Sequence, residues 1–110
     1  MPFNSVIISE EFERQAKRLI KKYKSLKQEL KDFEQDILTD PEQGDPLGSN
    51  VYKVRIAIAS KGKGKGGGAR IITYLYKDKS TIYLLTIFDK NEYDNVSDVY
   101  ISSIIKNLPL

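Results

Sequence analysis

Apolar residues recur at helical spacing in the first third of the chain. A stripe that repeats every three or four residues comprises Phe12, Ala16, Leu19, Ile20 and Tyr23. Ser9 is placed to cap this helix, and the three glutamates that follow favour the positive end of its dipole. A second stripe over residues 26–38 follows Ser25 and Gln28, which have capping-box spacing. The pattern therefore predicts a helical hairpin.

Shorter stretches rich in β-branched and aromatic residues predict strands. Residues 51–58 alternate, so that one face can enter a core while Lys53 and Arg55 project together from the other. Residues 40–50 carry two prolines and two glycines and are expected to form a connecting loop. The four expected strands span residues 2–8, which form an edge strand, 51–58, 69–76 and 81–88, the last two joined by a hairpin turn.

A last helix is expected after Ser97, with Ile101, Ile104, Ile105 and Leu108 on one side. The element order is then β-α-α-β-β-β-α. This order describes an α+β fold in which a helical hairpin packs on a mainly antiparallel four-stranded sheet. A chain of 110 residues has the size of one domain, so residues 1–110 are expected to form a single domain.

The chain contains no cysteine and no histidine. These absences exclude disulfides, zinc-thiolate sites, thiol nucleophiles and the Ser-His-Asp triad. Any chemistry must therefore use Lys, Arg, Tyr, Asp and Glu. The neighbouring acids Asp89, Glu92 and Asp94 are weak evidence for a metal site because lysines compete for them, and we expect no metal and no cofactor.

The N-terminal segment has no basic region ahead of its apolar residues, so it does not read as a secretory signal. The longest largely apolar run, residues 81–88, is far shorter than the roughly 20 residues that span a bilayer. We therefore expect a cytoplasmic protein without membrane contact.

Charge is unevenly distributed along the chain. Residues 1–46 hold 8 basic and 10 acidic residues, whereas residues 47–110 hold 10 and 5. Seven cations and no acid lie between residues 51 and 77. Such a stretch favours phosphate, nucleic acid or an acidic protein as partner, with a solvated basic surface as the alternative.

Residues 61–68 alternate lysine and glycine before a run of glycines, which predicts a mobile cationic loop. The loop lacks the Lys-Ser/Thr of a nucleotide-binding P-loop, and a strand follows it rather than a helix. Its lysines favour contact with a phosphate backbone, although a flexible loop kept soluble by lysine has the same composition. Lys61, Lys63 and Lys65 are its candidate phosphate-binding residues.

Two further groups lie at strand ends, where functional side chains often gather. Arg70 stands where the glycine-rich segment enters a strand, and we expect it on a polar face where its removal hardly affects folding. Lys90, Glu92 and Tyr93 follow the last strand, with a solvated turn as the alternative reading.

In this order and spacing the chain resembles the RelE/ParE superfamily of type II toxin–antitoxin toxins, especially its HigB-like branch. The resemblance covers nearly the whole chain. It rests on the helical hairpin with Phe12, Lys17 and Leu19, and on residues 46–48, 51–56, 61–74 and 82–92. It implies a cytoplasmic ribonuclease that enters the ribosomal A site, cleaves translated mRNA without a metal, and is inhibited by a cognate antitoxin.

The resemblance also implies roles for single residues. Arg70 would bind the scissile phosphate and Lys90 would support charge or handle protons, while Lys53, Arg55 and the lysines of the glycine-rich segment would hold RNA. Many relatives have a tyrosine where this chain has Phe88, so Tyr93 or Glu92 must do the proton work assigned there. The same fold also includes non-enzymatic gyrase inhibitors, and a basic RNA-binding module is a further alternative.

Overall fold

The structure is a computed structural model, and it describes residues 3–62 and 64–110. The first strand, β1 (Ser5–Ile8), leads directly into helix α1 (Glu10–Lys22). Ser9 caps this helix as predicted: its Oγ accepts a hydrogen bond from the backbone N–H of Phe12 at 2.9 Å and donates one to the carbonyl of Leu85 at 2.6 Å. One serine therefore both starts the helix and fixes it to the sheet.

Helix α2 (Leu26–Thr39) completes the predicted hairpin, but its start differs from the expected capping box. The Ser25 hydroxyl bonds the carboxylate of Glu29 at 3.0 Å and the hydroxyl of Ser60 at 2.9 Å. It also accepts the backbone N–H of Ser60 at 3.0 Å. The side chain thus ties the helical hairpin to the segment that precedes the glycine-rich run.

The strands form one mainly antiparallel sheet in the order β1-β5-β4-β3-β2. Strand β1 is parallel to β5, and the other neighbours are antiparallel. The remaining strands are β2 (Asp45–Gly48), β3 (Val51–Ile56), β4 (Ala69–Tyr76) and β5 (Thr81–Asp89). The α+β class and the mainly antiparallel sheet are therefore confirmed, and β1 lies at an edge as predicted.

The described sheet has five strands rather than four, because part of the expected loop 40–50 forms β2. Strand β2 pairs with β3 at the outer edge, where Pro46 needs no donor for a further strand. The chain then reverses through Ser49 and Asn50, both at positive φ, of 55° and 65°. Proline and glycine were read as loop signals, whereas an edge strand also tolerates them.

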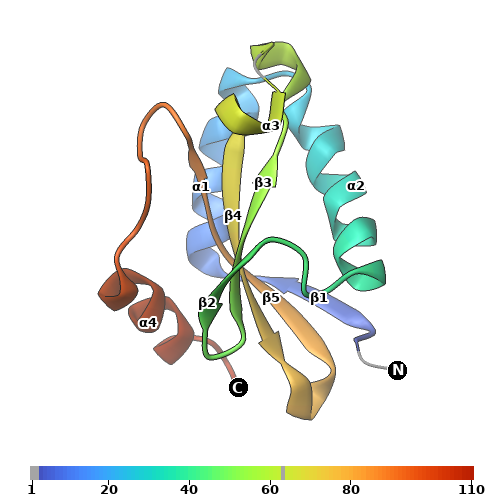
Figure 1. Cartoon of the computed structure of the whole chain (residues 1–110), viewed down its shortest axis with the longest axis vertical. Helices are drawn as coiled ribbons and strands as arrows, with labels where there is room; N and C mark the ends of the chain where they lie inside the picture. The colour runs from blue at the N-terminus through green and yellow to red at the C-terminus, as the bar shows by residue number, and fades with distance from the viewer. Residues whose placement is uncertain (1–2, 63) are drawn as a thin grey trace.

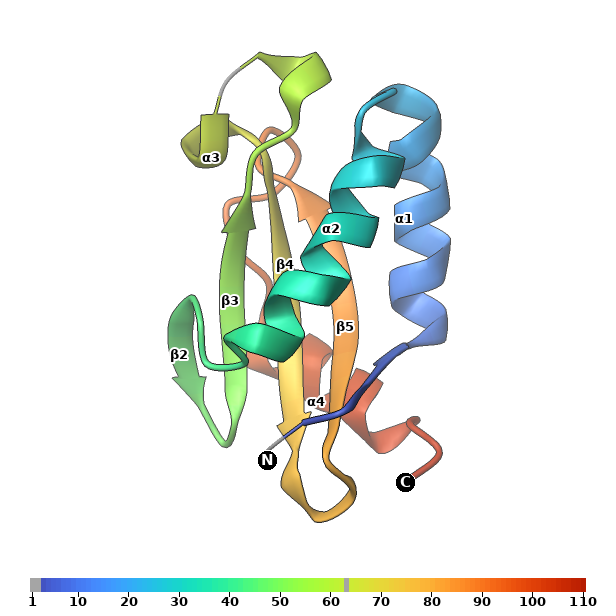
Figure 2. The ribbon, with the colours of Figure 1, turned by 90° about the vertical axis from the view of Figure 1, so that its right-hand side faces the viewer.

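The sheet carries helices on both faces. Helices α1 and α2 cover one face, and α4 (Asp98–Lys106) lies on the other, as Figures 1 and 2 show. The first face buries Leu19, Leu26 and Ile37 against the sheet, and Ile101 and Ile104 of α4 pack on the second. Strand β5 is buried along its whole length, which explains the apolar run of residues 81–88.

The segment 61–68 was predicted to be a mobile loop, and its described residues, with the two before them, include turns of helix. These are a 3-10 turn, η1 (Ala59–Lys61), and a short helical turn, α3 (Gly64–Gly67), at the end of the sheet where β3 ends and β4 begins (Figure 1). Lys63 lies outside the described residues, and only the backbone of Lys65 is described. No helix in the described part of the chain is long and apolar enough to cross a membrane.

Candidate functional site

The site is built on a row of side chains that crosses the sheet. Arg55 of β3 pairs with Arg70 of β4, and Arg70 pairs in turn with Phe88 of β5. Phe88 belongs to the hydrophobic cluster on the α4 side of the sheet, so the row lies on that face. Lys53 lies two residues before Arg55 and shares the face, as the alternation predicted. Three of the predicted cations are therefore brought together on one face.

Arg70 is only 5% exposed, so the expectation of an exposed polar position was wrong. Its strand is central, and neighbouring strands flank it on both sides. The guanidinium donates hydrogen bonds to the carbonyls of Gly66 and Ala69, each at 3.3 Å. It is thus held at the point where the glycine-rich segment enters β4.

Electrostatics at this row favour an anion. Burial lowers the pKa of Arg70, the positive charge of Arg55 lowers it further, and Asp45 acts in the opposite direction. Arg55 lies 3.8 Å from the Asp45 carboxylate. Since an arginine stays protonated in a protein, the guanidinium keeps its charge although burial, and after it the repulsion from Arg55, act against that charge. A phosphate placed over the pair would relieve this repulsion and accept the guanidinium donors.

Lys61 lies on the other face of the sheet and differs from the expected exposed RNA contact. Its side chain is 5% exposed, and Nζ lies 2.5 Å from Oδ1 of Asp89 and 3.2 Å from the carbonyl of Gly68. The Tyr23 hydroxyl donates to the other Asp89 oxygen at 2.5 Å. Lys61 is thus a buried partner of a carboxylate rather than part of a mobile surface.

Asp89 is fully buried. It links the end of β5 to Lys61 of the 3-10 turn and to Tyr23 at the end of α1. Burial raises the pKa of its carboxyl, but hydrogen bonds from Lys61, from Tyr23 and from the backbone N–H of Asn91 outweigh burial and lower the pKa to about 2. Sequence reasoning treated Asp89 only as a weak metal ligand. The sequence signal for its burial was its position two residues after Ile87, which places it on the face of β5 that the α1–α2 hairpin covers.

Lys90 begins the loop that leads from β5 to α4. Its backbone N–H donates to the carbonyl of Gly68 at 3.1 Å, which joins the end of β5 to the start of β4 beside Arg70. Its ammonium group lies 2.7 Å from the carboxylate of Asp94. The backbone of Lys90 is therefore fixed beside the site, while its side chain is engaged with an exposed acid.

Glu92 and Tyr93 separate in the structure. Glu92 accepts two hydrogen bonds from Arg18 of α1, at 2.8 and 3.0 Å, and this pairing lowers the pKa of its carboxyl. Tyr93 is 56% exposed, and its ring meets Phe88 edge-on at a centroid distance of 6.4 Å. Of these two proton-transfer candidates, Tyr93 lies beside the arginine row through Phe88, whereas Glu92 is paired with the helical layer.

Comparison with known proteins places this arrangement in a family. The model of the RelE toxin of the RelE/RelB toxin–antitoxin system matches residues 5–106. A mutant of the E. coli toxin RelE with two arginines replaced by alanine, solved in the free state, aligns with a TM-score of 0.60 and 16% identity over 98% of this chain and 99% of that one.

The isolated E. coli RelE toxin in its P21 crystal form also aligns with a TM-score of 0.60 and 16% identity, over 98% of this chain and 100% of that one. These matches share the fold, and the family match spans nearly the whole sequence. The superfamily resemblance is therefore confirmed, while the HigB-like branch stays a prediction. The chain belongs to the RelE toxin family of toxin–antitoxin systems.

Proposed function

We propose that this protein is a ribosome-dependent endoribonuclease that cleaves translated mRNA in the cytoplasm and arrests growth, and that a cognate antitoxin inhibits it. The observation that carries the proposal is the pairing of Arg55 with Arg70. This pair lies where the glycine-rich segment enters β4, beside the rings of Phe88 and Tyr93. Converging cations suit a phosphodiester, and family membership supplies the toxin–antitoxin context.

The chemistry needs neither histidine nor a metal, because the RNA contains its own nucleophile. The 2′-oxygen attacks the adjacent phosphorus, the bond from phosphorus to the 5′-oxygen breaks, and the products are a 2′,3′-cyclic phosphate and a 5′-hydroxyl. One proton leaves the 2′-hydroxyl and one reaches the departing 5′-oxygen. The protein then has to position the strand and stabilise the charge on the phosphoryl oxygens.

Arg70 is proposed to bind the scissile phosphate, because its guanidinium is held by two backbone carbonyls. Lys90 would leave Asp94 to support the charge or to handle a proton. Tyr93 is the better placed of the two remaining proton-transfer candidates, because Glu92 would first have to leave Arg18. Lys53, Arg55, Lys63 and Lys65 are proposed to hold the RNA backbone, and Lys61 is left out because it is buried.

The test is to express the protein from a tight promoter in growing cells and to map mRNA 5′ ends. Cuts in translated messages, in phase with codons, support the proposal, and Arg70→Ala should remove them. Incubation of purified protein with naked RNA and with translating ribosomes then decides ribosome dependence. DNA damage without mRNA cleavage would favour the gyrase-inhibitor alternative, and binding of RNA without either effect would leave a basic RNA-binding module.

The antitoxin part of the proposal has its own test. A lethal cationic surface is most simply inhibited by a segment that carries acids and apolar anchors. The reading frame beside this gene should rescue growth and co-purify with the protein. An adjacent frame that does neither would contradict this assignment without affecting the nuclease assay.

A further inference from the structure

The two edges of the sheet differ in how they are protected against pairing with another strand. An edge strand carries unpaired backbone N–H and C=O groups, and proteins usually guard such an edge with a charge, a proline or a bulge. Strand β2 has all three, in Asp45, Pro46 and the register shift between Pro46 and Gly48. Strand β1 has none of them, since residues 5–8 contain neither a charge nor a proline and pair with β5 without a shift. The β1 edge is therefore open to a further strand.

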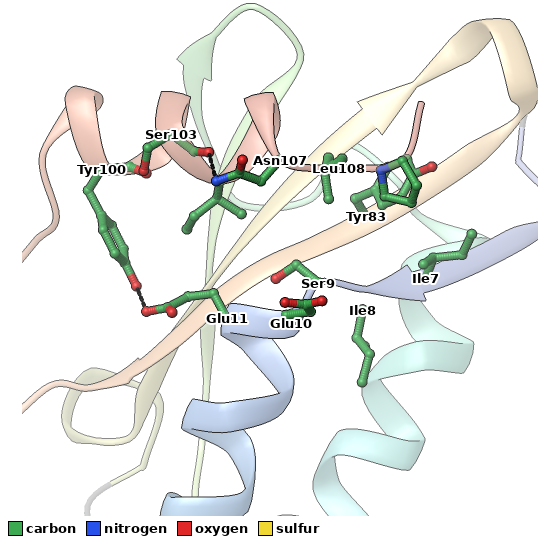
Figure 3. A pocket seen from close by; sticks show the side chains of 12 residues that line it. Ile7, Ile8, Ser9, Glu10, Glu11, Tyr83, Tyr100, Ser103, Asn107 and Leu108 are labelled. Atoms are coloured by element: carbon green, nitrogen blue, oxygen red, sulfur yellow. Dashed lines mark hydrogen bonds between the residues drawn. The ribbon is translucent and has the colours of Figure 1, made fainter.

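The exposed side chains at this edge are apolar and point to both faces of the sheet. Ile7 and Ile8 are 43% and 40% exposed. Ile7 pairs with Tyr83, on the α4 side, and Ile8 pairs with Leu84, on the side of the helical hairpin. Figure 3 shows the two isoleucines pointing in opposite directions from the strand. An added strand would thus meet an apolar side chain on each face.

A hollow lies beside the edge on each face. On the α4 side, a cavity of about 390 Å³ is lined by Ile7, Tyr83 and Leu108, among others (Figure 3). On the other side, a groove of about 220 Å³ is lined by residues of β1, α1 and α2, including Ile8 and Phe12. When a strand is added to a sheet, main-chain hydrogen bonds supply affinity and pockets for alternate side chains supply specificity. The β1 edge provides both.

The two ends of β1 carry opposite charge. Helix α1 begins directly after the strand, so Glu10 lies at the C-terminal end, where it lines the larger cavity. At the N-terminal end, the backbone N–H of Asn4 donates to the carbonyl of Ser80 at 3.0 Å, directly after the 3-10 turn η2 (Lys77–Lys79), which holds two lysines and one aspartate. The side chains of Glu10 and Lys79 are exposed, and neither forms an ion pair within the described part of the chain. A strand with one acidic and one basic end is complementary to itself when the second copy runs antiparallel.

We propose that the β1 edge is a dimerisation surface, to which a second copy of this chain adds its own β1 antiparallel. A two-fold axis perpendicular to the sheet keeps each face on its own side. Ile7 of the second copy would therefore enter the cavity beside α4, and Ile8 of the second copy would enter the groove beside α1 and α2. The same axis brings Glu10 of each copy towards Lys79 of the other, and the uncharged strand lets no like charges meet at the axis.

The proposed interface leaves the arginine row uncovered. Strand β1 pairs with the first part of β5, from Thr81 to Leu84, whereas Arg55 and Arg70 lie in line with Phe88 near the end of that strand. Dimerisation is therefore independent of the proposed nuclease function. Variants at the β1 edge should keep wild-type cleavage, and failure of either proposal leaves the other standing.

The first experiment measures the mass of the free, purified protein by sedimentation over a range of concentrations. The wild type should show a concentration-dependent equilibrium between monomer and dimer. Ile7→Lys brings two like charges together near the axis and should raise the dissociation constant of the dimer at least about tenfold. The matched control is Leu47→Lys on the β2 edge, because Leu47 has a similar exposure of 39%. A wild type that stays monomeric up to millimolar concentration, or a dimer that Ile7→Lys leaves unchanged, would overturn the proposal.

The second experiment tests the antiparallel arrangement by reversing charge at the two ends of β1. Glu10→Lys brings two basic groups together at each end of the interface, and Lys79→Glu brings two acidic groups together. Each variant alone should raise the dissociation constant about threefold or more. Mixing the two variants should restore the dimer, since every contact in the mixed pair then joins an acid to a base. Two weakened variants that do not recover on mixing would contradict the antiparallel arrangement.

Thermal unfolding shows whether each variant keeps its fold. If Ile7→Lys unfolds, the mixing experiment decides the proposal by itself, because Glu10 and Lys79 are both exposed. The wild type and Ile7→Lys are also compared for co-purification with the antitoxin. A monomeric wild type whose Ile7→Lys variant loses the antitoxin would show that this edge takes a strand of the antitoxin instead, and the proposal would be wrong.

Discussion

Lys61 and Asp89 form an ion pair that is closed to solvent. Their charged atoms lie 2.5 Å apart, and their side chains are 5% and 0% exposed. The pair joins the 3-10 turn before the glycine-rich segment to the last residue of β5. The carbonyl of Gly68 accepts from both Lys61 Nζ and the backbone N–H of Lys90. These contacts join the start of β4 to the end of β5, beside Arg70.

Removing one partner of this pair should destabilise the protein strongly. Asp89→Asn leaves the Lys61 ammonium buried without its counter-charge, and such a change typically lowers the free energy of unfolding by about 3–5 kcal/mol. Urea denaturation measures the loss. Asp94→Asn is the matched control, since the Asp94 side chain is 91% exposed and solvent screens its pair with Lys90, so that its removal should hardly change stability. Equal stability of the two variants would contradict a structural role for Asp89.

The same carboxylate predicts how stability depends on pH. Its pKa in the folded protein is about 2, against an ordinary value of 3.8. A lowered folded-state pKa stabilises the protein above the unfolded pKa, and this contribution is lost as the pH falls towards 2. A shift of this size corresponds to about 2 kcal/mol. The difference in unfolding free energy between wild type and Asp89→Asn should shrink by that amount between pH 6 and pH 2, and a constant difference would contradict the assignment.

Arg70→Ala should lower mRNA cleavage by about 10²–10³-fold, because a preorganised charge donor is lost from the transition state. It should also lower the unfolding free energy by about 1–3 kcal/mol, since the carbonyls of Gly66 and Ala69 lose a buried donor. Arg70→Lys keeps the charge without the planar fork and should recover stability more than cleavage. Cleavage-site mapping and urea denaturation separate the two effects.

The control for Arg70 is Lys17→Ala, a truncation of an exposed cation on α1 outside the row. It should leave cleavage near the wild-type level. An Arg70→Ala protein that folds and cleaves fully would remove Arg70 from the site. If Arg70→Ala unfolds, Arg70→Lys takes its place in the assay. A loss of cleavage by folded Arg70→Lys would then support the assignment, and full cleavage would contradict it.

Much of this fold follows from periodicity, because long apolar stripes bury one face whatever their partner is. The stripe from Phe12 to Tyr23 and the β-branched run of β5 are examples, and both elements lie where predicted. Strand β2 was missed because proline and glycine mark a loop by composition, while an edge strand needs only one paired side. Pairing with Lys53 and Tyr52 is a long-range choice that the segment 45–48 does not encode by itself.

The part of the candidate site that depends on alternation within one strand could be predicted. The part that depends on the register between strands could not. Lys53 and Arg55 share a face because they are two residues apart in one strand. That Arg70 lies beside Arg55 depends on how β3 pairs with β4, which no local pattern fixes. The burial of Lys61 depends on a carboxylate 28 residues away, so composition alone made an exposed lysine the natural reading.

Binding to single-stranded RNA should depend strongly on salt. Four cations, Lys53, Arg55, Arg70 and Lys90, give a slope of log K against log[salt] of about −3, and each further lysine on a phosphate adds about 0.7. A 2′-O-methyl RNA, which lacks the nucleophile, permits the measurement without cleavage. Lys53→Ala should reduce the slope by about 0.7, whereas Lys17→Ala, on the helical layer, should not change it. A flat response would remove the nucleic-acid assignment.

Replacement by alanine should affect two glycines of the segment before β4 to different degrees. A Cβ on Gly68 would lie 2.1 Å from the carbonyl oxygen of Ile56, a backbone atom that cannot move without shifting β3. Gly66 has no atom within 4 Å of such a Cβ. Gly68→Ala should therefore lower the unfolding free energy by about 1–3 kcal/mol, as overpacking does, while Gly66→Ala should stay within about 0.5 kcal/mol of wild type.

The glycine pair also links the fold to the site. Displacing β3 from β4 at Gly68 moves Arg55 away from Arg70, so Gly68→Ala should lose cleavage beyond what its remaining folded fraction explains. Gly66→Ala keeps the carbonyl that holds the Arg70 guanidinium and should cleave normally. Cleavage per folded molecule, from denaturation curves and 5′-end mapping on the same samples, is the measurement. Equal cleavage per folded molecule in the two variants would show that the spacing of the arginine row does not limit the reaction.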